Sequence, residues 1–457
     1  MPSEGVIREE KVIGEDRVRA LAEDLLAYST ADQTEVVLTA GESGLTRFAN
    51  SAIHQNVLES NAEVRVRAIL GKRIGVATSN SLDRVSLRQM VDGAISAAKH
   101  QPENPDFLSL PGPRPLTPVN ACDDATANCP PEDRAEAVRS ICALALADRL
   151  SAAGALETGY REYCVANSLG VFAYDTQSFA SLRSVVMSDT GSGYADQNSI
   201  YFSALSPEEV GRRAIDKALR SRDPVDLPPG EYVTLLEEYA VAEMVFYLAY
   251  LGLGAMALQE GRSFMNGRIG QPIADPRVSL WDDGRDPRGL PWSFDFEGVP
   301  KQRVDLIQDG VAKGVVYDSY TAGREGKAST GHALPAPNTY GPFPLNLCMK
   351  PGDAGKAKML ASVDRGLWVT RFHYVNVVHP TQTVLTGMTR DGTFLIEKGE
   401  IVGPVKNFRF TQSVLDALSA IRMIGSDVHF SRPDSDVSVV VPALLVDRFR
   451  FTGATQF

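Results

Sequence analysis

The sequence has little of what marks secreted, metal-binding or nucleic-acid-binding proteins. Its five cysteines are odd in number and form no CxxC pair, which indicates reduced thiols rather than a disulfide framework or a cysteine-rich metal site. Acidic residues outnumber basic ones and the formal net charge is -11, so attraction to a phosphate backbone is disfavoured. We therefore expect a protein of a reducing compartment that makes no direct contact with nucleic acid.

Long apolar runs are also missing. The N-terminus, MPSEGVIREEKVIGED, is charged rather than apolar, and the most apolar stretch, residues 241–258, is interrupted by Glu243 and two glycines. A bilayer span needs about 20 predominantly apolar residues, and a signal peptide needs an apolar stretch close to its start. The sequence therefore predicts neither a signal peptide nor a membrane anchor, and we expect a cytoplasmic protein.

The length of the chain indicates more than one domain. The chain has 457 residues, 44% of them hydrophobic, and is too long for a single ordinary domain. Its length therefore predicts two domains. The best boundary is the RDPVDLPPG segment at 222–230, where three prolines and a glycine separate a helix from a new strand. We predict an N-terminal domain over 1–227 and a C-terminal domain over 228–457.

The pattern of the first domain predicts antiparallel strands covered by helices. An apolar stripe predicts a helix over 15–28, and period-two alternation is clearest in EVRVRAIL at 63–70. A helix is expected from Ser81, then a proline-rich connector over 101–133, then more strands and a capped helix from Ser206. The recurrence of strands followed by a helix indicates either a weak internal duplication or two ordinary capped helices.

The second domain is predicted to be rich in strands. It opens with a long apolar helix over 239–258, followed mostly by strands and by loops rich in glycine and proline. Strands and helices do not alternate along it, which disfavours a doubly wound parallel sheet. We therefore predict an α+β protein of two domains dominated by antiparallel β-sheet with covering helices.

Three stretches of the second domain are specific as an ordered set. They are QEGRSF at 259–264 with GRIG at 267–270 and WDD at 281–283, LTGMTRDG at 385–392, and NFRFTQS at 407–413. Together and in this order they resemble the TldD/TldE (PmbA) family of peptidase subunits. The resemblance extends through both domains, is strongest from 230 to 418, and implies a TldD/PmbA-like fold.

That resemblance implies a cytoplasmic heterodimer of homologous subunits that cleaves peptides. The TldD-type subunit of this family holds zinc through an HExxxH motif on the long helix and a cysteine close to the C-terminus. Here the corresponding stretch is 246–251, FYLAYL, and neither histidine nor cysteine occurs from 239 to 259. Zinc needs three or four nitrogen, sulfur or carboxylate donors, so the resemblance implies a TldE/PmbA-type subunit with no catalytic residue, metal or cofactor of its own. The zinc is expected in the HExxxH partner.

Arginines within the motifs are candidates for binding a peptide substrate or the partner, because guanidinium groups bind carboxylates and backbone carbonyls. The alternative is that they pin loops inside the chain through Asp282, Asp283 and Asp391. A peptide is expected to bind as an added strand on a sheet edge. The predicted binding residues are Arg262, Ser263, Phe264, Arg268, Arg390, Asn407 and Arg409.

Other chemistry has weaker signals. His373 and His379 are six apart on an expected strand, too far apart to share one ion, and Ser263 lacks the GxSxG elbow of a serine hydrolase. Asp282-Asp283 with Asp286, or Asp295 with Glu297, are possible acid–base pairs, but such clusters are expected to be solvated turns. Gly252 and Gly254 are expected to allow close helix packing.

Two other functions stay open at this point. One is a homodimeric peptide-binding protein without hydrolytic activity, and the other is an enzyme of different chemistry that reuses the fold. The sequence names neither the substrate nor the pathway.

Overall fold

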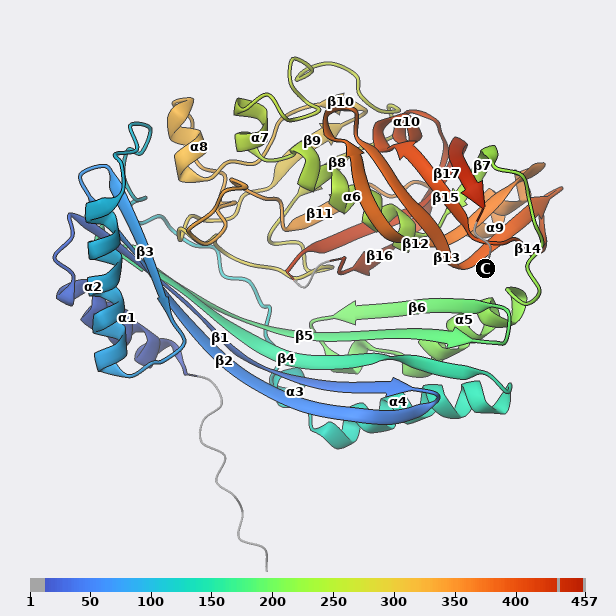
Figure 1. The fold of residues 1–457 in the computed structure, drawn as a ribbon, viewed down its shortest axis with the longest axis horizontal. Helices are drawn as coiled ribbons and strands as arrows, with labels where there is room; N and C mark the ends of the chain where they lie inside the picture. Colours follow the sequence, from blue (N-terminus) through green and yellow to red (C-terminus); the bar gives the residue numbers. More distant parts are fainter. Residues whose placement is uncertain (1–12, 434–435, 455–457) are drawn as a thin grey trace, which may run out of the picture.

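The computed structural model describes residues 13–433 and 436–454. Figure 1 shows two sheets: a long curved one from the N-terminal part of the chain, and another, from the C-terminal part, that lies over one of its faces. This confirms the predicted α+β class with large antiparallel sheets. We call residues 228–457 the second domain. In the part of the chain that the structure describes, no helix has the length and apolar character to span a bilayer.

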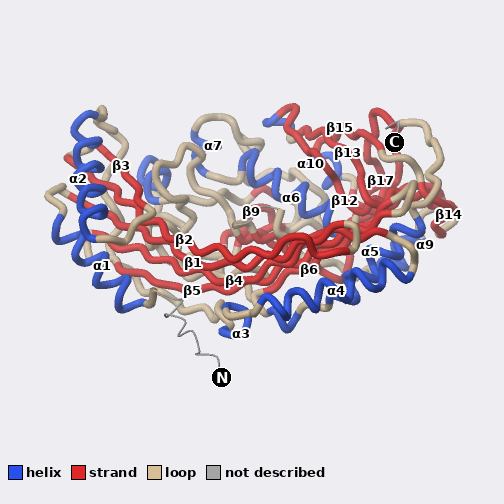
Figure 2. The backbone as a smooth tube through the Cα atoms, turned by 60° about the horizontal axis from the view of Figure 1, so that its bottom comes forward, coloured by secondary structure: helices blue, strands red, loops and turns tan. Residues whose placement is uncertain are grey.

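The first sheet is six-stranded and antiparallel throughout, in the order β3-β2-β1-β4-β5-β6. Figure 2 shows α1 and α2 at one end of this sheet and α4 and α5 at the other. The bounds are α1 Glu15–Tyr28, β1 Gln33–Ala49, β2 Ala52–Leu70, β3 Arg73–Ser79, α2 Arg84–His100, α3 Asp124–Ala127, α4 Pro131–Ala147, β4 Ser151–Asn167, β5 Phe172–Met187, β6 Ser192–Ser199 and α5 Pro207–Arg220.

The two halves of this sheet are built alike. Each has a helix, three antiparallel strands and a second helix, and the order of strands is symmetric about the β1–β4 pair. Each half also has its own apolar core, one under α1 and α2 and one under α4 and α5. A duplication would produce this arrangement, although common ancestry of the halves stays a prediction.

Each half also places a glycine of its outermost strand against a helix. A Cβ on Gly75 of β3 would lie 2.1 Å from the carbonyl oxygen of Ala94 in α2. A Cβ on Gly193 of β6 would lie 2.1 Å from the carbonyl oxygen of Ala214 in α5. Only glycine allows these helices to approach so closely.

Replacing Gly75 with alanine is therefore expected to lower the free energy of unfolding by about 1–3 kcal/mol, since backbone atoms leave the new methyl group no space. Gly93→Ala is the matched control, because that glycine lies inside α2 and its nearest neighbour would be 3.9 Å away. The control should raise stability by about 0.5–1 kcal/mol. Urea titrations of both variants test this, and equal effects would contradict the packing argument.

Helix starts differ in part from their predictions. The helix expected from Ser81 begins at Arg84, where the Asp83 carboxylate accepts from the backbone N–H groups of Val85 and Ser86. The helix after Ser206 does begin at Pro207, but the Ser206 side chain makes no capping hydrogen bond. The predicted capping box is wrong there, because Ser206 has ψ 77° rather than the extended value of a typical N-cap.

The second sheet has eleven strands and mixes antiparallel pairs with parallel ones, β11 with β17 and β12 with β7. The apolar helix α6 packs on β12 and β17 of this sheet. The bounds are β7 Gly230–Leu236, α6 Glu238–Gly252, α7 Ala255–Gln259, β8 Leu280–Asp282, β9 Val304–Gln308, β10 Val311–Ala312, α8 Ser319–Arg324, β11 Asn346–Met349, α9 Lys356–Ala361, β12 Arg365–His379, β13 Val384–Glu397, β14 Glu400–Pro404, β15 Phe408–Ser413, α10 Val414–Ser419, β16 Ile421–Ser431 and β17 Ser438–Ala454.

The single long helix predicted over 239–258 is wrong in one respect, because the helix breaks between α6 and α7. Gly254 is extended there, and a Cβ on it would lie 2.2 Å from the carbonyl oxygen of Pro342. A Cβ on Gly252 would lie 2.6 Å from the Ser263 Oγ. The two glycines do allow close packing, but against loops of the same chain.

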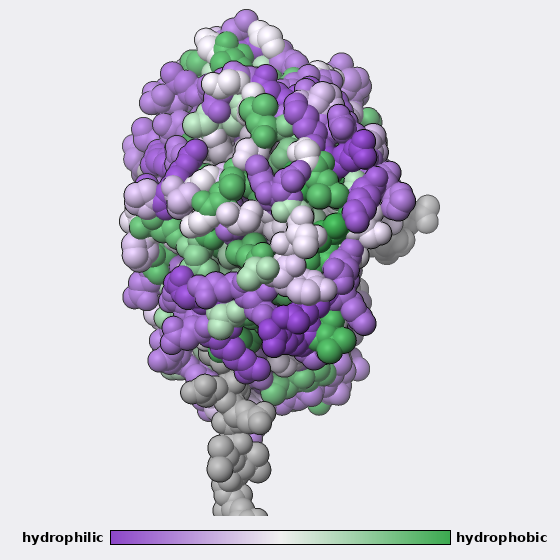
Figure 3. Space-filling model, turned by 90° about the vertical axis from the view of Figure 1, so that its left-hand side faces the viewer, coloured by the Kyte–Doolittle hydropathy of each residue, from purple (hydrophilic) through white to green (hydrophobic). Residues whose placement is uncertain are grey.

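Figure 3 shows the end of the molecule that carries α1 and α2. Its surface is mostly hydrophilic, and apolar residues are scattered among polar ones. Scattered apolar residues are normal on a protein surface, so this end carries no sign of a broad apolar contact.

Candidate functional site

A polar cleft of about 700 Å³ lies between the first sheet and the second domain. Much of its lining alternates along the strands, such as Thr39 and Gly41 on β1 and Arg161 and Tyr163 on β4. Alternate residues of a strand share one face of a sheet, so the floor of the cleft is the face that the second domain covers. We call this space the central cleft.

An open strand edge borders the central cleft. β2 pairs with β1 from Ala52 to Ile69, but β3 pairs with β2 only from Val64 onward. No described strand pairs with the other edge of residues 52–63, and Glu59, Ser60 and Asn61 of this segment line the cleft. Free backbone N–H and C=O groups along such an edge can pair with an added strand.

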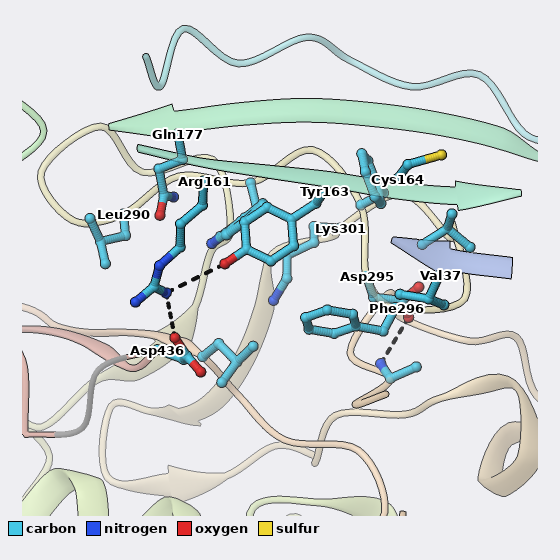
Figure 4. Close-up of a pocket in the computed structure, with 15 residues that line it drawn as sticks. Val37, Arg161, Tyr163, Cys164, Gln177, Leu290, Asp295, Phe296, Lys301 and Asp436 are labelled. Atoms are coloured by element: carbon cyan, nitrogen blue, oxygen red, sulfur yellow. Dashed lines mark hydrogen bonds and ion pairs between the residues drawn. The ribbon is translucent and has the colours of Figure 1, made fainter. Parts of the chain in front are cut away.

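The central cleft continues into a small pocket with aromatic walls (Figure 4). Arg161 belongs to both spaces; its guanidinium donates to the Tyr163 hydroxyl over 3.4 Å and forms an ion pair with Asp436. Lys301 enters from the second domain, and Figure 4 shows its ammonium directed into the pocket. We call this space the Lys301 pocket; its aromatic walls are Tyr163, Trp292, Phe294 and Phe296.

Lys301 belongs to a buried charged network. Its Nζ lies 3.9 Å from the Asp282 Oδ1, which also accepts from the His332 Nε2 over 2.8 Å. The other oxygen, Oδ2, accepts from the backbone N–H of Asn346 over 2.7 Å. Burial raises the pKa of Asp282, but Lys301 and His332 outweigh it and leave that pKa below its ordinary value.

The histidine of this network has a pKa below its ordinary value. Burial first and then the charge of Lys301 lower the pKa of His332, although Asp282 opposes them. A neutral ring donates from Nε2 to Asp282 and accepts at Nδ1 from the Thr330 hydroxyl, 2.9 Å away. Asp282 and Lys301 thus carry the two opposite charges of the network.

A second buried network joins the two domains. Arg67 of β2 donates to the Glu35 carboxylate of β1 over 2.6 Å and to the Glu297 carboxylate of the second domain over 3.3 Å. Glu297 also accepts from the backbone N–H of Ser319 over 2.9 Å. The side chains of Arg67, Glu35 and Glu297 are 12%, 2% and 8% exposed, so little water screens this contact between domains.

Asp295 lies next to this network with both oxygens engaged. It accepts from the backbone N–H groups of Glu297, Val299 and Ala333. Burial first and then the Glu297 charge raise the pKa of Asp295 to about 7. The expectation that Asp282, Asp295 and Glu297 lie in solvated turns is therefore wrong, because all three are buried.

Stability is expected to fall as the pH rises from about 4 towards 7, because folded Asp295 keeps a proton that the unfolded chain releases near pH 4. The contribution is fully present below the ordinary carboxyl pKa and is lost as the pH passes the folded value. Glu35 adds to it, since burial raises its pKa despite Arg67. Urea titrations between pH 4 and 8 measure this slope, which Asp295→Asn should flatten; an unchanged slope would contradict the assignment.

The first group of predicted binding residues lies after α7 and lines neither the central cleft nor the Lys301 pocket. Ser263 is 2% exposed, and its hydroxyl donates to the carbonyl oxygen of Gly252, so it is a structural residue rather than an accessible nucleophile. Phe264 is buried in the core. Arg262 is exposed and pairs with Glu260, and Arg268 is half-buried.

The second group gathers at another pocket, of about 310 Å³, where Arg390 and Asn407 lie with His373. Arg409 is exposed on the neighbouring strand β15, where its backbone lies opposite that of Met388 in β13. Asp391 does not hold Arg390 closely; it accepts from the Arg371 Nε and from the Ser192 hydroxyl, each over 2.6 Å. Binding of substrate or partner by these residues stays a prediction.

The TRDG motif lies within a strand of the second sheet. β13 runs through it, and the pairing of β12 with β13 shifts register there. At this irregularity Asp391 and Gly392 both have positive φ, 55° and 123°. The irregularity turns the Asp391 carboxylate towards Ser192 of the first sheet.

The helix stretch at 246–251, which the resemblance sets against the zinc motif, carries aromatic contacts. The Tyr247 hydroxyl donates to the carbonyl oxygen of Val375 over 2.6 Å, and the ring of Phe246 lies against Phe343. Tyr250 is half exposed beside Tyr340. Apolar and aromatic side chains of this kind do not fit zinc, which takes thiolate, imidazole or carboxylate ligands.

Of the residues that line the Lys301 pocket, the sequence singled out Asp295 but neither Arg161 nor Lys301. Arg161 is one of many polar residues on long strands, and Lys301 follows a loop with no motif. His332, which belongs to the charged network of Lys301, is buried. A buried lysine cannot be recognised without the long-range pairing that brings Asp282 next to it.

Comparisons with known proteins cover nearly the whole chain. The family model of PmbA/TldA metallopeptidase domain 1 matches residues 34–98, the central-domain model matches 126–222, and the C-terminal-domain model matches 229–453. The first two matches fall on the two halves of the first sheet, and the third falls on the second domain.

Individual relatives agree with these matches. Metalloprotease TldD homolog of Haemophilus influenzae is 24% identical over 88% of this chain and 87% of its own, and Metalloprotease PmbA homolog of the same organism is 23% identical over 94% of each. The crystal structure of TldE from Thermococcus kodakarensis has a TM-score of 0.87 at 20% identity, over 95% of this chain and 100% of that one. The chain therefore belongs to the PmbA/TldD metallopeptidase family.

Proposed function

We propose that this chain is the zinc-free subunit of a cytoplasmic heterodimeric metallopeptidase that degrades or matures peptides. The observation that carries the proposal is the sequence of α6. In a family of metallopeptidases, this helix presents Phe246, Tyr247 and Leu251 where the TldD-type subunit is expected to present the two histidines and the glutamate of its HExxxH motif. These side chains pack on the chain itself and leave the hydrolytic metal to the partner.

The central cleft supports a role in holding the peptide. Its lining is polar, and the open edge of β2 at 52–63 offers backbone groups to an extended chain. Pairing through the backbone selects an unfolded segment and depends little on its side chains. The chain would thus help to enclose the peptide while the partner cleaves it.

Exposed arginines of the predicted set are suited to contact the partner. Arg262, Arg390 and Arg409 are on the surface, and the guanidinium of Arg390 has only a 4.0 Å contact with Asp391. Arginine is enriched at protein interfaces because its planar group binds carboxylates and carbonyls at once.

Co-expression with the HExxxH homologue of the same organism tests the pairing. The expected result is a 1:1 complex of the two chains in size-exclusion chromatography with light scattering. Arg390→Glu should weaken this complex, with Arg220→Glu on α5 as a matched surface control. A chain that forms only homodimers in the presence of that homologue would contradict the proposal.

A further inference from the structure

The Lys301 ammonium is buried and lacks a hydrogen-bond partner among the described residues. Its side chain is 2% exposed, and the 3.9 Å to Asp282 is too long for a hydrogen bond. A buried charge without hydrogen bonds is costly, so a ligand that supplies an acceptor would be held strongly. We propose that the Lys301 pocket binds the carboxylate of a peptide in the central cleft.

The dimensions of the pocket fit a carboxylate and little more. The space inside it is about 30 Å³, room for roughly two oxygen-sized groups. Trp292, Phe294 and Phe296 enclose it, so the carbon chain next to the carboxylate would meet aromatic surface. A phosphate, with four oxygens, is larger than this space.

The mouth of the pocket already binds a carboxylate of the chain itself. Asp436 pairs with Arg161 there, and the Asp436 side chain is 63% exposed. Because Asp436 stands largely in solvent, an incoming carboxylate can replace it on Arg161. The Asp436 carboxylate thus occupies a position that we assign to the ligand.

Charges of both signs surround this mouth, and Arg161 is the arginine that lines both the Lys301 pocket and the central cleft. The guanidinium carbons of Arg161 and Arg432 lie 5.1 and 5.2 Å from the centre of the Phe179 ring. Burial and then Arg161 lower the pKa of Arg432 to about 10, against the opposing charges of Glu157 and Asp436. Arg432 lines a neighbouring pocket with Glu157 and Asp196, so we assign the ligand carboxylate to Arg161 and Lys301.

The peptide carboxylate has two sources, the C-terminus and an acidic side chain. The identity of the ligand as a peptide rests on the proposed function, because the central cleft and the open edge of β2 suit an extended chain. The carboxylate would fix one end of that chain while the β2 edge aligns the rest. Arg262, Arg268, Arg390 and Arg409 were the predicted carboxylate-binding residues, and none of them lines this pocket.

Calorimetric titration of the full chain with three hexapeptides tests the assignment. The first is an alanine–leucine peptide with a free C-terminus, the second its C-terminal amide, and the third an amide with a glutamate in the last position. The free acid should bind about tenfold more tightly than the amide, the effect of one charge-assisted hydrogen bond. Tight binding of the third peptide would identify the acidic side chain as a source.

Two variants with opposite effects separate binding from damage to the fold. Lys301→Met should remove the preference for the free acid, whereas Asp436→Asn should strengthen its binding by removing the internal competitor. Lys313→Met, at an exposed lysine, is the matched control and should change nothing.

Equal binding of all three peptides by the unaltered chain would overturn the inference, as would an unchanged preference for the carboxylate in Lys301→Met. Failure of every peptide to bind would overturn it too. None of these results touches the zinc-free subunit proposal, which depends on complex formation and activity with the partner.

Discussion

Arg67→Met is expected to lower the free energy of unfolding by about 3–5 kcal/mol. The substitution keeps an aliphatic chain of similar length but leaves Glu35 and Glu297 buried without their cation. Because Glu297 belongs to the second domain, the loss should also uncouple the domains. Urea denaturation followed by circular dichroism measures the first effect, and hydrogen exchange in the Glu297 loop measures the second.

Arg65→Met is the matched control, two residues earlier on the same strand. Its partner Glu63 is 36% exposed, and a pair of this kind contributes about 0–1 kcal/mol. In the double variant Arg67→Met/Glu35→Gln, part of the lost stability should return, since one unpaired charge is removed. A similar small effect for Arg65 and Arg67 would contradict the account of the interdomain network.

Asp282→Asn is expected to cost about 3–5 kcal/mol as well, because it leaves the buried Lys301 ammonium without its counter-charge. The amide keeps the size of the side chain, so loss of charge rather than a cavity accounts for the effect. Thermal and urea unfolding both report it.

Adding Lys301→Met to Asp282→Asn should restore most of that stability, since both charges are then gone. The His332 ring is 0% exposed in its side chain and stays in the network as a neutral group. A double variant as unstable as Asp282→Asn alone would show that the hydrogen bonds of Asp282, and not its charge pair with Lys301, hold this region.

Local patterns predicted the elements whose signal lies within a few residues. The stripe over 15–28 and the alternation at 63–70 give α1 and β2 because periodicity records which face is buried. The break between α6 and α7 was missed, since it depends on Pro342, far away in sequence. The burial of acids such as Asp282 was misjudged for the same reason, because the partners that bury Asp282 come from other elements of the chain.

For the predicted site residues too, local patterns gave part of the answer, and the rest depends on contacts between distant parts of the chain. The motifs identified the family, but motif membership did not reveal role: Ser263 and Phe264 are structural, whereas Arg390 and Asn407 share a pocket. The Lys301 pocket combines β4 of the first sheet with loops of the second domain. Only the packing of one domain on the other creates it, so no local pattern predicts it.

The most direct test of the central claim is zinc content and peptidase activity of the purified chain, alone and with the HExxxH homologue. The account predicts no bound zinc and no cleavage for the chain alone. With the homologue it predicts one zinc per heterodimer and cleavage of an unfolded peptide. Stoichiometric zinc or cleavage by the isolated chain would contradict it.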